Sequence, residues 1–119
     1  MLEIKIVSIT PVEGVILQEQ THIVELPALC PRTHNPLAGS LITLTYTPVN
    51  HQVLEVYNLT DYIHSFTGSQ IVRDIEHFAQ VVAADCGKAL HTDVQVTVEF
   101  ILNIGQRVRT KVLWKEPQQ

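Results

Sequence analysis

The 119-residue sequence is poor in charge, in cysteine and in long apolar runs. Twelve acidic residues outnumber eight basic ones, and the only basic cluster, residues 107–115, follows the alternation of a strand, so nucleic-acid binding is not expected. No apolar run approaches the length of a membrane span, and residues 1–5 lack the features of a secretory signal. Cys30 and Cys86 are too few for a disulfide framework and are expected to be reduced thiols. These absences predict a cytoplasmic protein with neither nucleic-acid nor membrane partners.

The length and the hydrophobic content, 45%, fit one compact domain that covers residues 1–119. No room is left for a separate cofactor domain. A cofactor would therefore have to bind to this domain or between copies of it.

Strands are predicted in the first half of the chain. Loose alternation interrupted by Pro11 and Gly14 predicts short strands around 3–9, 13–19 and 22–26. The segment 27–39 contains three prolines and reads as a loop, and it carries Cys30. The β-branched run 40–48 alternates apolar residues with threonine, as a half-buried antiparallel strand does.

Two helices and two further strands are predicted next. Apolar spacings of three to five residues predict a short helix over residues 53–66. A stronger helix is predicted to start at a Ser69 cap, to end at Gly87, and to bury the stripe Ile71, Val72, Ile75, Phe78, Ala79 and Val82. Strict alternation predicts strands at 92–100 and 106–114.

This order predicts an α+β fold, an antiparallel sheet with two helices on one face, arranged ββααββ. The sheet would have two exposed edges. Because unpaired edges readily accept another strand, we expect several copies to pair their edges and close into a ring.

The run Leu29-Cys30-Pro31-Arg32-Thr33-His34-Asn35-Pro36 resembles the active-site Cys-Pro-x-Thr segment of the QueF-type nitrile reductases. Across roughly residues 29–100, further similar residues are Tyr46-Thr47-Pro48, Glu55, Tyr62 and Ser65-Phe66. The resemblance implies a tunnelling fold (T-fold): rings of subunits that bind a purine- or pterin-like ligand between neighbours. In that family a cysteine attacks the nitrile of 7-cyano-7-deazaguanine during queuosine biosynthesis.

Several functional positions of that family differ in this chain. The family's cofactor motif, Glu-Ser-Lys-Ser-x-Lys-x-Tyr, corresponds to residues 55–62, where Tyr57 and Thr60 replace the two lysines. Leu37 stands at the general-acid position, Arg73-Asp74 at the His-Glu pair, and 103–106 lacks the Arg-Gly-Gly signature. Without the lysines the obvious contacts for the phosphates of NADPH are missing. We therefore expect no cofactor, and NADPH-dependent reduction is not predicted.

Cys30 is the candidate nucleophile, because Arg32 or His34 beside it could lower the pKa of its thiol. The alternative is a structural loop cysteine. Candidate substrate-binding residues are Glu55, Asp74 and Glu76, whose carboxylates can accept two hydrogen bonds from a heterocycle, together with the neighbouring His77. No metal is expected, because the spacings Cys30-x3-His34 and Cys86-x4-His91 match no familiar zinc pattern.

Two functions remain open on the sequence alone. One is an enzyme that holds a purine-like heterocycle between subunits and forms a thioimide on Cys30, acting as a nitrile reductase-like or amidinotransferase-like protein. The other is a non-catalytic, homo-oligomeric binding or scaffold protein on the same fold.

Overall fold

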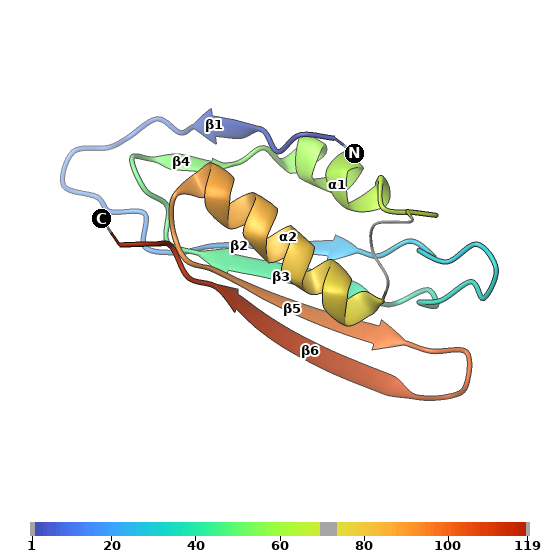
Figure 1. Cartoon of the computed structure of the whole chain (residues 1–119). Helices are drawn as coiled ribbons and strands as arrows, with labels where there is room; N and C mark the ends of the chain where they lie inside the picture. Colours follow the sequence, from blue (N-terminus) through green and yellow to red (C-terminus); the bar gives the residue numbers. More distant parts are fainter. Residues whose placement is uncertain (1, 70–73, 119) are drawn as a thin grey trace.

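The computed structural model describes residues 2–69 and 74–118. Its main sheet has four antiparallel strands in the order β2-β3-β5-β6: β2 (Gln20–Glu25), β3 (Leu41–Tyr46), β5 (Val94–Ile101) and β6 (Arg107–Trp114). A separate two-stranded sheet joins β1 (Ile6–Ser8) to β4 (Gln52–Leu54). The helices α1 (Val56–His64) and α2 (Ile75–Leu90) pack against one face of the main sheet (Figure 1). The predicted α+β fold, an antiparallel sheet with two helices on one face, is thus confirmed for the single chain.

The alternation of β3 and β5 determines which face of the sheet is covered. In β3 the residues Ile42, Leu44 and Tyr46 are buried, and in β5 every second residue from Val94 to Phe100 is buried. These side chains join the core with the aromatic rings of Tyr62, Phe66 and Phe78, which meet edge to face.

The opposite face of the sheet carries mostly polar residues. The paired positions Ile23, Thr43, Thr97 and Lys111 form one row across all four strands. The next row is Glu25, Leu41, Glu99 and Arg109, in which Arg109 forms an ion pair with Glu99 at 3.3 Å. Successive side chains of a strand point to opposite faces, so the predicted half-buried sheet has one packed and one open face.

Both helices begin at an acidic cap. Glu55 accepts hydrogen bonds from the N–H groups of Tyr57 and Asn58 at the start of α1. Asp74 accepts one from the N–H of His77 at 2.6 Å, so α2 begins at Ile75 and the predicted Ser69 cap is wrong. Ile71 and Val72, expected on the apolar stripe, lie outside the described residues.

The predicted end of the second helix at Gly87 is also wrong. The helix continues to Leu90 and ends at His91, which has the left-handed conformation with φ 57°. Gly87 serves the packing of Trp114, because a Cβ built on Gly87 would lie 1.9 Å from Trp114 Cδ1. Glycine therefore allows the end of β6 to approach α2 closely.

The N-terminal region differs most from the sequence prediction. Residues 13–19 form no strand: a turn at 13–14 with Gly14 at φ 81° leads into an extended connection on which Ile16 is 81% exposed. This segment links the small sheet to the large one and pairs with neither. The predicted start of the first helix at residue 53 is wrong, because Val53 and Leu54 belong to the strand β4, whose three residues give too short a pattern to recognise.

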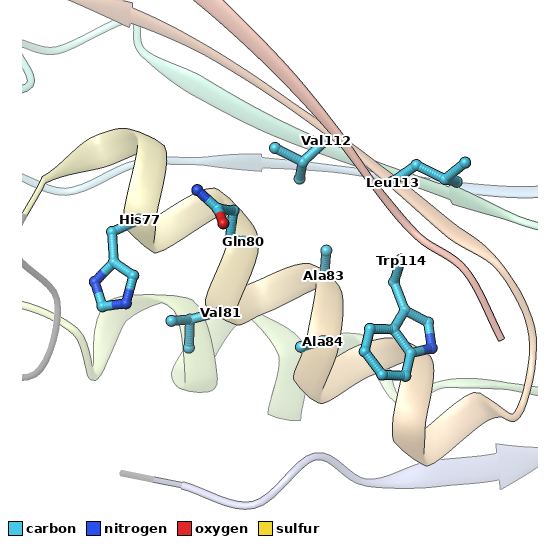
Figure 2. A pocket seen from close by; sticks show the side chains of 8 residues that line it. All are labelled: His77, Gln80, Val81, Ala83, Ala84, Val112, Leu113 and Trp114. Carbon is cyan, nitrogen blue, oxygen red and sulfur yellow. The ribbon is translucent and has the colours of Figure 1, made fainter. Parts of the chain in front are cut away.

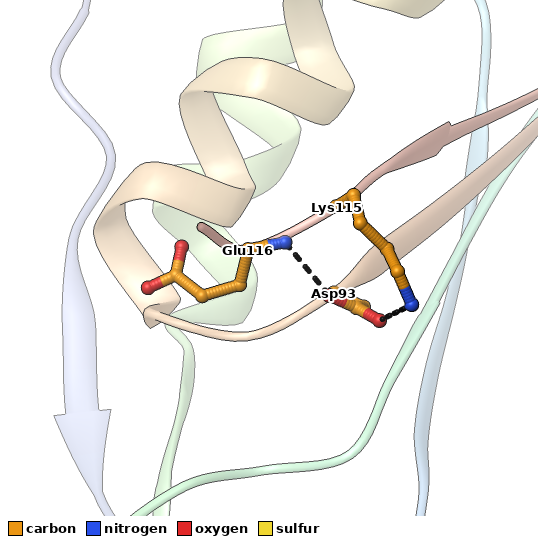
Figure 3. Close-up of polar contacts among 3 residues, drawn as sticks. All are labelled: Asp93, Lys115 and Glu116. Carbon is orange, nitrogen blue, oxygen red and sulfur yellow. Dashed lines mark hydrogen bonds and ion pairs between the residues drawn. The ribbon is translucent and has the colours of Figure 1, made fainter. Parts of the chain in front are cut away.

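The residues after β6 are tied back to the α2–β5 turn. Asp93 accepts a hydrogen bond from the N–H of Glu116 at 2.7 Å and lies 3.3 Å from Lys115 Nζ (Figure 3). These contacts hold the pKa of Asp93 below its usual value, through the Glu116 N–H first and Lys115 next. No helix in the described part of the chain is long and apolar enough to cross a membrane.

Candidate functional site

Cys30 is exposed in the β2–β3 loop, in a turn closed by the hydrogen bond from the His34 N–H to Cys30 O at 2.8 Å. The hydroxyl and N–H of Thr33, followed by the N–H of Arg32, hold the pKa of the thiol below its usual value, while the charge of Arg32 adds the smallest effect. Thr33 Oγ1 also accepts the N–H of Asn35 at 3.3 Å, which leaves its own proton for the sulfur. The sequence assigned this effect to Arg32 or His34. Thr33 is the main contributor, and His34 is not one.

A network of hydrogen bonds, here called the loop clasp, fixes the Cys30 turn to the β5–β6 turn. Asn103 donates its N–H to Asn35 Oδ1 at 2.9 Å and its side-chain amide to Thr33 O at 3.2 Å, and Asn35 Nδ2 donates to Asn103 Oδ1 at 3.3 Å. The Cys30 N–H in turn donates to Asn35 O at 3.0 Å. Residues that lie 68 or 70 positions apart in the sequence thereby fix the geometry around the Cys30 thiol.

We expect Asn103→Ala to raise the pKa of Cys30 toward its ordinary value, because the clasp no longer holds Thr33 against the sulfur. The rate of alkylation by iodoacetamide at neutral pH should fall several-fold, and its pH profile should move to higher pH. Asn58→Ala is the matched control, since Asn58 bonds to Glu3 and Lys5 instead. A pH profile unchanged by Asn103→Ala but shifted by Asn58→Ala would contradict this role.

Three of the candidate substrate-binding residues lie together at the start of α2. Asp74 is the cap, Glu76 is exposed, and His77 is half-buried. Figure 1 shows the start of α2, the β2–β3 loop and the β5–β6 turn at the same end of the molecule. The chain therefore carries its candidate nucleophile and its acidic helix start at one end of the sheet.

Glu55 lies apart from this group. It caps the start of α1, whereas the Cys30 loop contacts the far end of that helix, where the Gly68 N–H donates to Leu29 O at 2.8 Å. Nine helical residues separate the two ends by about 13 Å. The structure does not bring Glu55 to Cys30 within the chain, and the Glu55 carboxylate already accepts hydrogen bonds from two N–H groups.

A groove of about 390 Å³ lies between α2 and the edge strand β6. Most of its lining residues are apolar, and Figure 2 shows Ala83 of α2 facing Val112 of β6, with Trp114 lying over the later part of the helix. Gln80 and His77 line the part nearest the start of α2. Its size is within the range of small-molecule sites. The groove therefore extends from the acidic helix start along an unpaired strand edge.

The described residues give no geometric support for a metal site or for a reactive thiol at Cys86. Among residues 2–69 and 74–118, no group of three His, Cys, Asp or Glu side chains is arranged to hold a metal ion. Cys86 is buried, and burial raises the pKa of its thiol strongly. Arg73, at the family's His-Glu position, falls outside the described residues.

Comparison with known protein families and with curated proteins finds no match to this chain. The proposals below therefore rest on the fold, the site geometry and the resemblance of the Cys30 segment.

Proposed function

We propose that this chain assembles into a homo-oligomeric tunnelling-fold ring that binds a purine or 7-deazaguanine-like heterocycle between neighbouring copies, with Cys30 as nucleophile. The observation that carries the proposal is the Cys30 turn, which is closed by backbone hydrogen bonds to His34 and Asn35 and leaves the thiol exposed, with its pKa lowered by Thr33 first. We place the ring in the cytoplasm, where both thiols stay reduced.

The turn suits attack on a nitrile carbon. The thiolate sulfur would form a bond to that carbon while one π bond of the nitrile breaks and its nitrogen takes up one proton, which gives a thioimide without a leaving group. Leu37 cannot supply the proton. We assign this donor role to His77 or Glu76 at the α2 start of the neighbouring copy. The step needs neither NADPH nor another reductant.

The two sheet edges carry opposite charge. No Lys or Arg occurs between Lys5 and Arg32, so the β2 edge is flanked by Glu19 and Glu25 alone. The β6 edge instead carries Arg107, Arg109 and Lys111, with Lys115 just beyond its end. Like charges disfavour the pairing of two β6 or two β2 edges, whereas β6 of one copy and β2 of the next are complementary. The charges thus favour the head-to-tail contacts that close rings.

The strand directions determine what meets at such a boundary. Neighbours in the sheet are all antiparallel, so β2 of the next copy would continue the sheet antiparallel to β6. The end of that β2, which leads into its Cys30 loop, would then lie beside the start of β6. The start of α2 is at this same end (Figure 1). We therefore expect a site at this boundary. It is formed by Cys30 of one copy and by three residues of its neighbour, Asp74, Glu76 and His77.

Charge reversal tests the boundary. We expect Arg107→Glu with Arg109→Glu to dissociate the ring and to weaken assembly by at least about tenfold, as close interfacial charge pairs contribute 1.5 kcal/mol or more. Combining these changes with Glu19→Lys and Glu25→Lys should restore assembly, as measured by light scattering. Reversal of Glu13 and Lys5, away from both edges, is the control. Dissociation without restoration would argue for a different interface.

One observation favours the non-catalytic alternative, a ring that binds a ligand or scaffolds a partner. Leu37 lies at the expected acid position with its N–H bonded to Ile101 O at 2.8 Å, so the backbone there is fixed and offers no proton donor. On this alternative the heterocycle binds, as calorimetry would show, and no covalent adduct forms.

A further inference from the structure

His22 is a buried titratable residue that the proposed chemistry does not use. It lies on the edge strand β2 and is 8% exposed. Its Nε2 lies 2.8 Å from Tyr46 Oη of β3, with the two rings stacked. Tyr46 Oη also accepts the N–H of Leu54 in β4 at 2.9 Å. One phenol oxygen therefore joins three strands of two different sheets.

The number of protons in this network depends on the charge of His22. Tyr46 Oη accepts from Leu54, and its own proton needs an acceptor in the core, which neutral His22 provides at Nε2. A protonated imidazole carries a hydrogen on Nε2 and can only donate. The Tyr46 hydroxyl would then meet a second donor, the N–H of His22, and would lose the acceptor for its own proton. The positive charge of His22 would also enter the core. Both changes destabilise the buried arrangement.

We propose that protonation of His22 releases the edge strand β2 from the core, so that this residue is an acid-sensitive switch. His22 is the only buried residue of β2, and neighbouring positions of the strand are half-buried or exposed. The strand has one neighbour in the sheet, β3. On this inner face Val24 is half-buried against the core, and His22 makes the one fully buried contact.

Among the titratable groups of this network, His22 is the one that responds to acid. Tyr46 faces it from β3, and burial raises the pKa of Tyr46 to about 12. Cys86 of α2 acts on Tyr46, and its own pKa is raised. From α1, His64 bonds to Glu25 O at the end of β2, while β4 contributes only the Leu54 N–H. No described residue forms an ion pair with His22 that would stabilise its charge.

The direction of the pH effect follows from burial, which lowers the pKa of His22 from its ordinary value of 6.5. The unfolded strand binds a proton more readily than the folded one, so the attachment of β2 is complete above pH 6.5 and is lost as pH falls through the folded pKa. Release of β2 needs no assembly. In the proposed ring, which this consequence rests on, the same event would open the boundary between copies.

Hydrogen–deuterium exchange of the full chain tests the switch. Corrected for intrinsic rates, the protection of residues 18–26 should fall by up to roughly tenfold for each pH unit between 6.5 and the folded pKa, and should level off below the folded pKa. In His22→Gln, whose neutral amide can accept from Tyr46, the protection should not depend on pH. His51→Gln, at an exposed site, should behave as the unmodified chain does.

Exchange of the imidazole C–H, followed by mass spectrometry, measures the titration of His22 in the unmodified chain and so does not depend on any variant folding. The expected result is a His22 pKa below 6.5, with the loss of β2 protection falling between pH 6.5 and that pKa. A pKa at or above 6.5, or an equal loss of protection in His22→Gln, would overturn the switch. Neither readout involves the heterocycle, so the proposed function can fail while the switch stands.

Discussion

Incubation with 7-cyano-7-deazaguanine should add the mass of one intact nitrile molecule to the protein, on Cys30 and not on Cys86. The mass is that of the whole compound because thioimide formation releases nothing. Cys30 is exposed among donors that favour its thiolate, whereas Cys86 is buried and its pKa is raised. Intact-protein and peptide mass spectrometry locates the adduct.

The matched variants separate reactivity from binding. Cys30→Ala should abolish the adduct, Cys86→Ala should leave it, and Thr33→Val, which removes the main donor to the sulfur, should slow its formation at neutral pH. Absence of an adduct alongside measurable heterocycle binding would favour the non-catalytic ring. An adduct on Cys86 would show that the account of the two thiols is wrong.

Gly87→Ala should destabilise the fold, although alanine is normally the better helix residue. The added methyl would meet Trp114 Cδ1 at 1.9 Å and Cγ at 2.4 Å, so the ring must leave its place on α2. Forced repacking of this kind costs about 1–3 kcal/mol, more than the 0.5–1 kcal/mol that replacing a helical glycine gains. Urea denaturation at fixed protein concentration measures the free energy of unfolding.

A double-mutant cycle provides the control for this prediction. In a Trp114→Leu background the same Gly87→Ala change should cost little or become stabilising, because the obstructing ring is gone. An equal loss in both backgrounds would mean that Gly87 matters for a reason other than the approach of Trp114.

Sequence patterns predicted those parts of the fold that are determined by residues close together in the sequence. Alternation of period two located β3, β5 and β6, because one face of the sheet is packed and the other is open. The helix α2 followed from its apolar spacing. Its end did not, because the role of Gly87 depends on Trp114, a residue of another strand.

The site was predictable in its residue types and not in its contacts. Cys30 is placed in a loop by the composition of residues 27–39, and its turn is local. The clasp by Asn103 and the network from His22 to Leu54 depend on strand register, which no local pattern contains. Glu55 was grouped with Cys30 from its carboxylate and from the family resemblance, and in the structure it lies at the other end of α1.

Native mass spectrometry of the unmodified chain at micromolar concentration, with the heterocycle present, tests the central claim most directly because it counts subunits and ligands in one particle. The account predicts a closed oligomer that carries up to one heterocycle per subunit boundary. A monomer, or an oligomer that binds no heterocycle, would contradict it.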